Sequence, residues 1–260
     1  MKYVSITFDD GRADNYDVAF PIMKQYGLVG TIYCTTGYID GSWKSTSWKS
    51  AGKPVSIEQM HELQEAGWEL ALHGDKHITD VDDFCNAIAK MKTWGFDAKT
   101  FGFSMPDSVS EEQKYKDFVK TYLGKVVLYI RKGRKIDTGK LTSKLMYAGY
   151  SMLGCQAAYN IFNKINVIST EHIDRENIYT VVVRYEDRPQ MISRFLKQLP
   201  DETWTVFMLH SILPETDPLY GSDAWNWSRR RFESFCMGIT NMVNEGSIMV
   251  RTVKDVINKA

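Results

Sequence analysis

Residues 3–11 of the chain read YVSITFDDG, an apolar, β-rich run that ends in two carboxylates and a glycine. A short apolar run bounded by a turn signal predicts a buried strand, here from Tyr3 to Phe8. Asp9 and Asp10 would then stand at the carboxyl end of that strand, and Gly11 would begin the turn after it. From this strand onward, predicted strands and helices alternate along the chain.

The alternation covers the first hundred residues and returns in the last eighty. Helices are predicted at 16–26, 56–67, 80–94, 190–199 and 225–244, and strands at 28–34, 68–72, 100–103, 178–184, 204–209 and 248–251. Such a pattern is typical of βαβ units that build a largely parallel sheet. Because no linker or repeat interrupts the chain, we expect one domain over 1–260, with 108–177 as a divergent insert within it.

Composition excludes several classes of protein. The 260 residues carry 32 Lys+Arg against 32 Asp+Glu, which argues against a nucleic-acid binder, because that class needs a basic surface. The sequence contains no apolar run of about eighteen residues, so no membrane span is predicted. The four cysteines form no C-x-x-C pair, and a strand that begins at Tyr3 leaves no room for a cleavable leader. We therefore expect a cytoplasmic protein.

Three polar clusters each follow a predicted strand: Asp9-Asp10, then His73 with His77, then His210. Alone, each cluster also fits a turn, a solvated pair or a structural histidine. Together they predict a shared site, because the carboxyl ends of parallel strands meet at one edge of the sheet. Two imidazoles and one carboxylate leave room for water and substrate, as a catalytic divalent metal requires. The second aspartate could act as general base and a histidine across the cavity as acid.

These motifs resemble those of the polysaccharide deacetylases, the NodB-homology or carbohydrate esterase 4 family. Residues 7–11 (TFDDG) match the family's first motif, and 73–77 (HGDKH) are similar to its second, His-Ser/Thr-x-x-His. Leu209-His210 looks like its fifth motif. Residues 20–27 and 31–37 resemble the first helix and the second strand of the family. The likeness covers about 3–105 well and 180–260 more loosely.

The resemblance implies a fold, a site and a reaction. The fold would be an α/β, distorted, incomplete (β/α) barrel with an elaborated middle segment. Asp10, His73 and His77 would ligate one divalent metal, with zinc as the default ion and cobalt, nickel or iron as alternatives. Asp9 would be the general base and His210 the general acid. The reaction would remove an N-acetyl group from an amino sugar or glycan precursor, as a step of polysaccharide biosynthesis.

The chain departs from the family's pattern at three places. Gly74 stands where Ser or Thr is usual, which removes a hydroxyl that would brace the histidine loop. Residues 102–106 (GFSMP) replace the third motif, Arg-Pro-Pro-Tyr-Gly, so the arginine that holds the base is missing, although Met105 could still offer its backbone N–H to an oxyanion. The arginines that could substitute are Arg12, Arg131 and Arg184. Asp187 is the nearest equivalent of the aspartate that orients the acid histidine; the alternative is an exposed loop carboxylate.

Aromatic residues give a hint about the substrate. Trp43 and Trp48 lie in the loop after the second strand, and Trp225 and Trp227 lie beyond His210. On the catalytic rim their rings could stack on sugar faces, although aromatic residues are also good core fillers. The basic run 229–231 could clamp a phosphate, or it could be a solvated helix face.

Two alternatives to the deacetylase hypothesis remain open from the sequence. The missing arginine and the altered fourth motif are compatible with a relative that binds glycans without turnover. A deacylase that acts on another amide or ester, such as a formamido sugar or an O-acetyl group, would use the same scaffold.

Overall fold

The computed structural model describes residues 1–96, 99–106, 112–135 and 141–259. Most of its strands belong to one sheet: β1 (Lys2–Phe8), β2 (Thr31–Cys34), β3 (Glu69–Leu72), β4 (Phe101–Ser104), β5 (Val127–Arg131), β6 (Ile168–Ser169), β7 (Val181–Val182), β8 (Thr203–Leu209) and β11 (Ile248–Val250). Their order is β5-β4-β3-β2-β1-β8-β6, with β11 also paired to β1 and β7 to β8. All pairs are parallel except β6 with β8.

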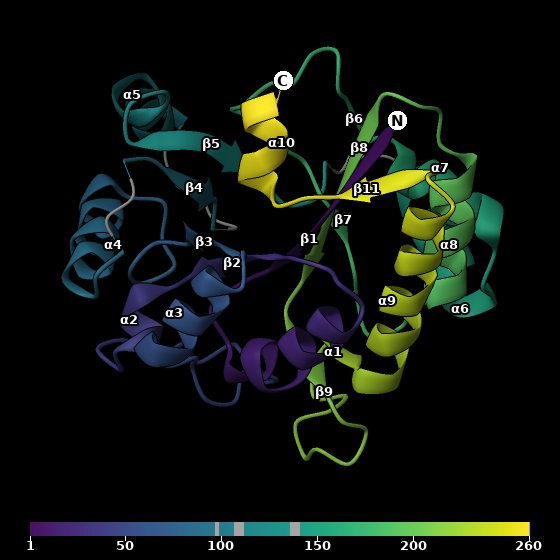
Figure 1. Cartoon of the computed structure of the whole chain (residues 1–260), viewed down its shortest axis with the longest axis horizontal. Helices are drawn as coiled ribbons and strands as arrows, with labels where there is room; N and C mark the ends of the chain where they lie inside the picture. Colours follow the sequence, from purple (N-terminus) through teal and green to yellow (C-terminus); the bar gives the residue numbers. More distant parts are fainter. Residues whose placement is uncertain (97–98, 107–111, 136–140, 260) are drawn as a thin grey trace.

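The sheet curls until its two ends approach each other. Ile178 forms a parallel bridge with Arg131 at the end of β5, and β7, which follows Ile178, pairs with β8. The result is an incomplete (β/α) barrel, which confirms the fold class expected from the sequence. Figure 1 shows the helices outside the curled sheet and α10 between β5 and β8.

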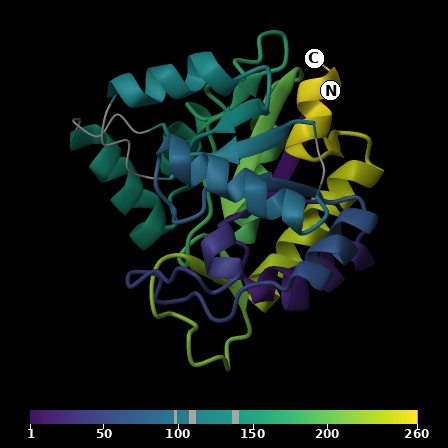
Figure 2. The ribbon, with the colours of Figure 1, turned by 90° about the vertical axis from the view of Figure 1, so that its left-hand side faces the viewer.

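Helices connect the strands and cover the outside of the sheet (Figures 1 and 2). They are the π-helical turn η1 (Asn15–Ala19), α1 (Phe20–Gln25), α2 (Thr36–Ile39), α3 (Ile57–Glu65), α4 (Val81–Thr93), α5 (Glu112–Tyr122), α6 (Leu141–Leu153), α7 (Gln156–Lys164), α8 (Pro189–Gln198), α9 (Arg229–Asn244) and α10 (Val253–Lys259). Local sequence sets their starts. Ser56 forms a capping box with Gln59 ahead of α3, and the Asp80 carboxylate caps α4.

Two apolar cores lie on the two sides of the sheet. The larger core packs the outer helices against the strands and includes Phe8, Trp68 and Phe207. The smaller core fills the inside of the barrel, where Trp204 meets Val253 and Ile257 of α10. The inner core closes one end of the barrel, so the open rim for a site lies at the other end, where the strands finish.

The structure corrects one predicted helix and shows which strand the middle segment, 108–177, adds to the sheet. The expected helix at 225–244 begins only at Arg229, because Asn226–Ser228 form a short strand, β10, that pairs with β9 (Ser211–Leu213). The Ser228 hydroxyl then caps α9 by accepting a hydrogen bond from the Arg231 N–H. The middle segment, which the family likeness hardly covers, supplies β5 to the barrel. Among the described residues, no helix is both long and apolar enough to cross a bilayer.

Candidate active site

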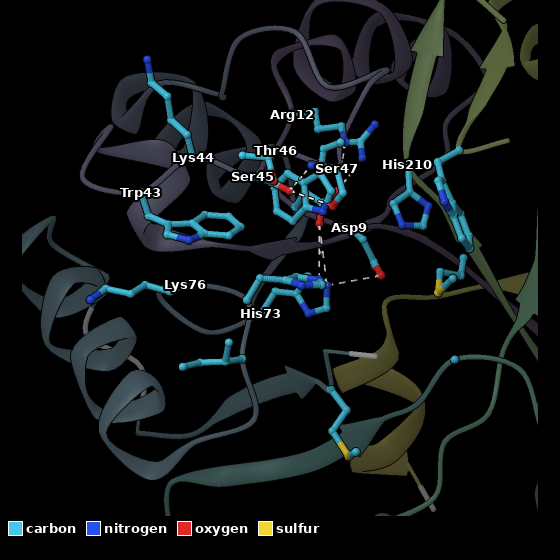
Figure 3. Close-up of a pocket in the computed structure, with 18 of the residues that line it drawn as sticks. Asp9, Arg12, Trp43, Lys44, Ser45, Thr46, Ser47, His73, Lys76 and His210 are labelled. Carbon is cyan, nitrogen blue, oxygen red and sulfur yellow. Dashed lines mark hydrogen bonds and ion pairs between the residues drawn. The ribbon is translucent and has the colours of Figure 1, made fainter. Parts of the chain in front are cut away.

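Strand register brings the three polar clusters to one edge of the sheet. Phe8 pairs with Leu209, so Asp9 and His210 leave neighbouring strands at the same level. Cys34 pairs with Leu72 of β3, which places His73 beside them. All these side chains line a cavity of about 590 Å³ at the carboxyl ends of the strands (Figure 3). The convergence predicted from the sequence is therefore present.

Asp10, His73 and His77 form a compact set of candidate metal ligands. Their ligand atoms lie within 4.8 Å of one another. The two imidazole Nε2 atoms are 3.0 Å apart, and Asp10 Oδ1 lies 3.8 Å from His73 Nε2 and 3.9 Å from His77 Nε2. Two imidazoles and one carboxylate are a donor set that suits a divalent transition metal with open positions.

Hydrogen bonds outside this set orient its members. His73 Nδ1 lies 2.9 Å from the Ser104 carbonyl oxygen, which can only accept, so Nδ1 carries the proton and Nε2 presents a lone pair to the cluster. Burial acts to raise the pKa of Asp10, but Arg12 and the three surrounding imidazoles outweigh it and lower the pKa to about 2. Asp10 is therefore a carboxylate at neutral pH, as a ligand must be. These observations show that the residues fit a metal ion.

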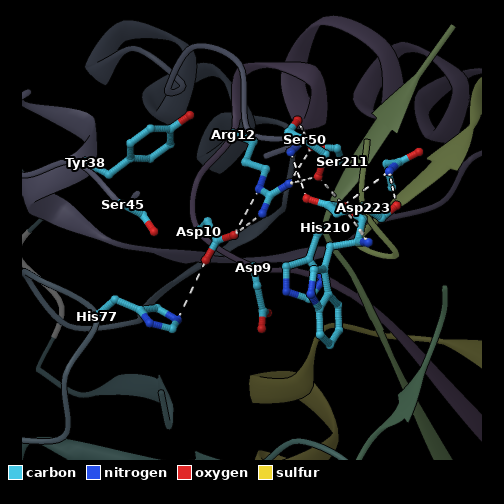
Figure 4. A network of polar contacts seen from close by, with 12 residues as sticks. Asp9, Asp10, Arg12, Tyr38, Ser45, Ser50, His77, His210, Ser211 and Asp223 are labelled. Atoms are coloured by element: carbon cyan, nitrogen blue, oxygen red, sulfur yellow. Dashed lines mark hydrogen bonds and ion pairs between the residues drawn. The ribbon is translucent and has the colours of Figure 1, made fainter. Parts of the chain in front are cut away.

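Arg12 holds the outer oxygen of Asp10. Its guanidinium lies 2.7 Å from Asp10 Oδ2 and also donates to the hydroxyls of Ser50 and Ser211 (Figure 4). With Oδ2 engaged, Oδ1 is the oxygen that faces the histidines. The Arg12 side chain is 1% exposed, so this ion pair is shielded from solvent.

The loop that carries the two histidines is braced without the family's hydroxyl. Gly74 has a φ of +83°, and a Cβ there would lie 2.4 Å from Asp83 Oδ2. The Asp83 carboxylate, from α4, accepts hydrogen bonds from the backbone N–H groups of Asp75 and Lys76. A carboxylate from the next helix thus takes over the bracing expected from Ser or Thr.

Arg131 supplies the arginine that the third motif lacks. Its Nη2 lies 2.5 Å from Asp9 Oδ2, and both side chains are buried. The same Nη2 donates to the Ser104 hydroxyl. Arg131 ends β5, the strand next to β4, where the family's arginine was expected at Gly102. A side chain at Gly102 would collide with Tyr129, because its Cβ would lie 2.2 Å from the Tyr129 hydroxyl oxygen.

A column of polar side chains runs from Arg131 into the barrel. The Arg131 guanidinium lies 4.5 Å from the centre of the Tyr33 ring, and the Tyr33 and Tyr129 hydroxyls are 2.9 Å apart. Tyr129 donates to Glu69 Oε1, while Thr31 donates to Oε2. Burial raises the pKa of both tyrosines, so their hydroxyls remain protonated donors. The column fixes Arg131 from behind.

Asp9 and His210 line the cavity next to the ligand set, at the ends of neighbouring strands. Asp9 Oδ2 is held by Arg131, whereas Oδ1 is buried with no hydrogen-bond partner in the described part of the chain. The His210 ring packs against Trp225, with ring centres 4.7 Å apart. Desolvation lowers the pKa of His210 to about 4, although Asp10 and Asp9 act to raise it. An unpartnered carboxylate oxygen and an imidazole beside a metal-ligand set can together move protons.

Asp187 lies elsewhere in the fold. Its Oδ2 accepts a hydrogen bond from the Arg184 N–H, and the residue does not line the cavity. His210 Nδ1 has no hydrogen-bond partner among the described residues, so the structure does not pair it with Asp187. Asp187 is nevertheless not the exposed loop carboxylate of the alternative hypothesis, because it is 2% exposed.

The expected substrate contacts divide into two groups. Trp43, Trp48 and Trp225 line the cavity, with Trp48 against the His77 ring at 5.0 Å. Trp227 is 2% exposed and donates its indole N–H to the Asp187 carbonyl, so it belongs to the core. The Met105 side chain lines the cavity, but its backbone N–H donates to the Arg131 carbonyl at 2.9 Å. The sheet therefore uses the N–H that was expected to face an oxyanion.

The basic run 229–231 lies outside the cavity. Arg230 is 88% exposed at its side chain and pairs with Glu215 at 3.6 Å. Arg231 packs over the Tyr185 ring and donates to the Tyr185 carbonyl. Neither arginine lines the cavity. This placement matches the solvated helix face rather than the phosphate clamp.

Fold and site define the class as an incomplete (β/α) barrel with an Asp-His-His cluster on its rim. The family model for "Polysaccharide deacetylase" matches residues 1–127. The "Putative polysaccharide deacetylase YxkH" of Bacillus subtilis (strain 168) is 35% identical over 79 residues, which are 30% of this chain and 24% of YxkH. This alignment thus spans about a quarter of that relative.

Solved structures share the fold at low sequence identity. The Xyl-CE4 domain of a multidomain xylanase from the hindgut metagenome of Trinervitermes trinervoides is 13% identical, with a TM-score of 0.51 over 99% of this chain and 90% of that one. A family 4 acetyl xylan esterase from Clostridium thermocellum, solved with a cobalt ion, is 12% identical, with a TM-score of 0.51 over 98% and 90%. Through residues 1–127, the chain is similar to the polysaccharide deacetylase family.

Removal of Arg131 should destabilise the fold by leaving Asp9 as an unpaired buried charge. We expect Arg131→Met to lower the free energy of unfolding by about 3–5 kcal/mol. Adding Asp9→Asn should recover much of the loss, because the unpaired charge is then gone. Denaturant unfolding measures the free energy of unfolding of the wild type, of Arg131→Met and of the double variant. Arg230→Met, at an exposed arginine, is the control and should change stability by less than about 0.5 kcal/mol. Equal losses in the single and double variants would contradict this account.

Asp187 should make stability depend on pH. Burial raises the pKa of Asp187 from 3.8 to about 7, so between these values the folded state binds a proton that the unfolded state has released. Stability attributable to this group is therefore present at low pH and is lost as pH rises through the window from about 4 to 7. Asp187→Asn should flatten this fall, by on the order of a few kcal/mol between about pH 4 and pH 8.

Chemical denaturation across that pH range tests this expectation. The control is Asp201→Asn, because the Asp201 side chain is 74% exposed and its removal should leave the pH dependence unchanged. An identical pH dependence in wild type and Asp187→Asn would show that the Asp187 carboxyl does not titrate in this window.

Proposed function

We propose that the protein is a divalent-metal-dependent hydrolase that removes an N-acetyl group from an amino sugar or glycan precursor. The observation that carries this proposal is the meeting of Asp10, His73 and His77 with a second, differently held aspartate, Asp9, in one cavity. The match of residues 1–127 to the polysaccharide deacetylase model supports a hydrolase that acts on acetylated carbohydrate.

Asp10 Oδ1, His73 Nε2 and His77 Nε2 would hold the metal ion. Zinc is the default for this donor set, and cobalt, nickel or iron would also suit it. A bound divalent ion would supply Lewis-acid polarisation of the acetyl carbonyl and would make water more acidic. A buried arginine pairs with each of the two aspartates in the cavity, Arg12 with Asp10 and Arg131 with Asp9.

Asp9 and His210 would move the protons of the reaction. Asp9 Oδ1 would accept a proton from the attacking water, while Arg131 keeps Oδ2 in place. The amide C–N bond breaks, the water oxygen remains in acetate, and the departing amine takes a proton, which we assign to His210. Trp225 restricts the His210 ring by packing against it. Asp9 directly follows β1 and His210 directly follows β8, so the ends of these strands fix the positions of both residues.

One of the alternatives loses part of its basis. A relative that binds glycans without turnover was compatible with the missing arginine of the third motif and with the altered fourth motif. Arg131 contacts Asp9 directly, which removes the first reason. No described residue lies within hydrogen-bond distance of His210 Nδ1, so the second reason stands, and acetate release decides between the two functions.

Acetate release from a panel of N-acetylated sugars should require the metal. We expect activity to disappear after chelation and to return with zinc or cobalt, because the ion would polarise the acetyl carbonyl and acidify the attacking water. His73→Ala should lower both metal content and activity by about a hundredfold or more. The control is His172→Ala, an exposed histidine outside the cavity, which should leave both unchanged. Activity that survives chelation or His73→Ala would exclude the metal mechanism.

Substitutions of the adjacent residues Asp9 and Asp10 should differ in their effects on metal content. Asp9→Asn should reduce kcat by about 10²–10⁴-fold while the bound metal remains stoichiometric, because Asp9 acts as base and not as ligand. Asp10→Asn should lose metal as well as activity. Elemental analysis of the purified variants, together with the acetate assay, measures both properties. Loss of metal in Asp9→Asn, with metal retained in Asp10→Asn, would reverse the assignment.

A further inference from the structure

The outer end of the catalytic cavity differs in chemistry from its inner end. Trp43 and Lys44 come from the loop after α2, and Lys76 comes from the histidine loop. In Figure 3 the two lysines lie on either side of the Trp43 ring, at the end of the cavity away from Asp9 and His210. In this view the Nζ atoms of both lysines point outward at the ends of flexible stems. An aromatic ring flanked by two lysine side chains can bind a sugar face and an anion together.

The carboxylates of the cavity are already neutralised. Asp9 pairs with Arg131 at 2.5 Å and Asp10 with Arg12 at 2.7 Å. The cavity is therefore lined by four cationic side chains against two carboxylates, before any metal is counted. In a chain with a net charge of zero, this local excess is not a property of the whole surface.

Acidic residues close in sequence to the two lysines are engaged by a third lysine. Asp40 Oδ2 and Asp75 Oδ1 each lie 2.7 Å from Lys90 Nζ. Within the described residues, neither Lys44 nor Lys76 forms an ion pair. Their positive charges consequently remain available to a ligand at the cavity mouth.

Hydroxyl groups also line the cavity. Ser45, Thr46 and Ser47 follow Lys44 and line the same cavity. Hydroxyls and ammonium groups are donors to carboxylate and phosphate oxygens. At about 590 Å³, the cavity is in the size range that holds more than an acetamido group.

We propose that this outer end binds an anionic group, a carboxylate or a phosphate, on the N-acetylated sugar or on the unit linked to it. This inference rests on the proposed deacetylase function and narrows its substrate class. The positive excess would attract an anionic glycan, and Trp43 would stack on the sugar that carries or adjoins the charge. Lys44 and Lys76 are thus residues for substrate specificity, separate from the groups that perform hydrolysis.

Matched substrates test the proposal. Acetate release is measured for a neutral N-acetylglucosamine oligosaccharide and for two counterparts, one with a carboxylate and one with a phosphate. We expect a lower KM for at least one anionic counterpart, and the two arms identify which anion is bound. The preference should shrink as ionic strength rises, because salt screens exposed charges.

Lysine variants locate the effect. Lys44→Gln and Lys76→Gln should each raise KM for the anionic substrate roughly three- to tenfold, with kcat and the neutral substrate unaffected. Lys49→Gln is the matched control, because Lys49 is an exposed lysine of the same loop that does not line the cavity. If Lys44→Gln and Lys76→Gln change only kcat, or if Lys49→Gln raises KM equally, the two lysines have no role in anion binding.

The outcomes separate this inference from the proposed function. Equal KM values for neutral and anionic sugars, unchanged by Lys44→Gln and Lys76→Gln, would overturn the anionic subsite and leave deacetylation intact. If no sugar releases acetate, the proposed function fails, and calorimetric binding of the same substrates to the wild-type protein then decides the inference. Absence of salt-sensitive binding to any anionic sugar would overturn it.

Discussion

Parallel pairing of β1 with its neighbours is the constraint on which the site depends. Because β1 lies between β8 and β2, Asp9 and His210 leave adjacent strands at matched positions, and β2 brings β3 and His73 alongside. Residues about two hundred positions apart in sequence thus meet without any long loop to hold them. A slip of one residue between β1 and β8 would turn the side chains of β1 to the opposite face and would separate the cluster.

The second organising feature is the pairing of each cavity aspartate with its own buried arginine. Arg12 takes one oxygen of Asp10 and leaves the other to the histidines, and Arg131 does the same for Asp9, whose second oxygen is left without a partner among the described residues. Two adjacent carboxylates would otherwise repel each other in a buried site. The arginines would therefore allow neighbouring residues to carry the different roles proposed for them, one as a ligand and one as a base.

The sequence predicted the parts of the fold and site that have local signals. Strand β1, the capped helices α3 and α4, and the ligand set Asp10, His73 and His77 each follow from spacing or a motif. Arg131 could be named only as one of three candidates, because its contact with Asp9 requires β5 to pair with β4, which is a long-range event in a segment without a motif. The burial of Trp227 likewise depends on the pairing of β10 with β9.

The polar column inside the barrel links the inner core to the cavity. Glu69 anchors Tyr129 and Tyr33, and Tyr33 supports the Arg131 guanidinium that neutralises Asp9. With Asp9 and Asp10 paired to arginines, the charge at the mouth of the cavity is set by Lys44 and Lys76. In the proposed reaction a neutral amide becomes a cationic amine, which this positive cavity would repel. An anion on the substrate would offset that repulsion for the bound sugar, so the same charges would favour substrate entry and weaken the hold on the deacetylated end of the product.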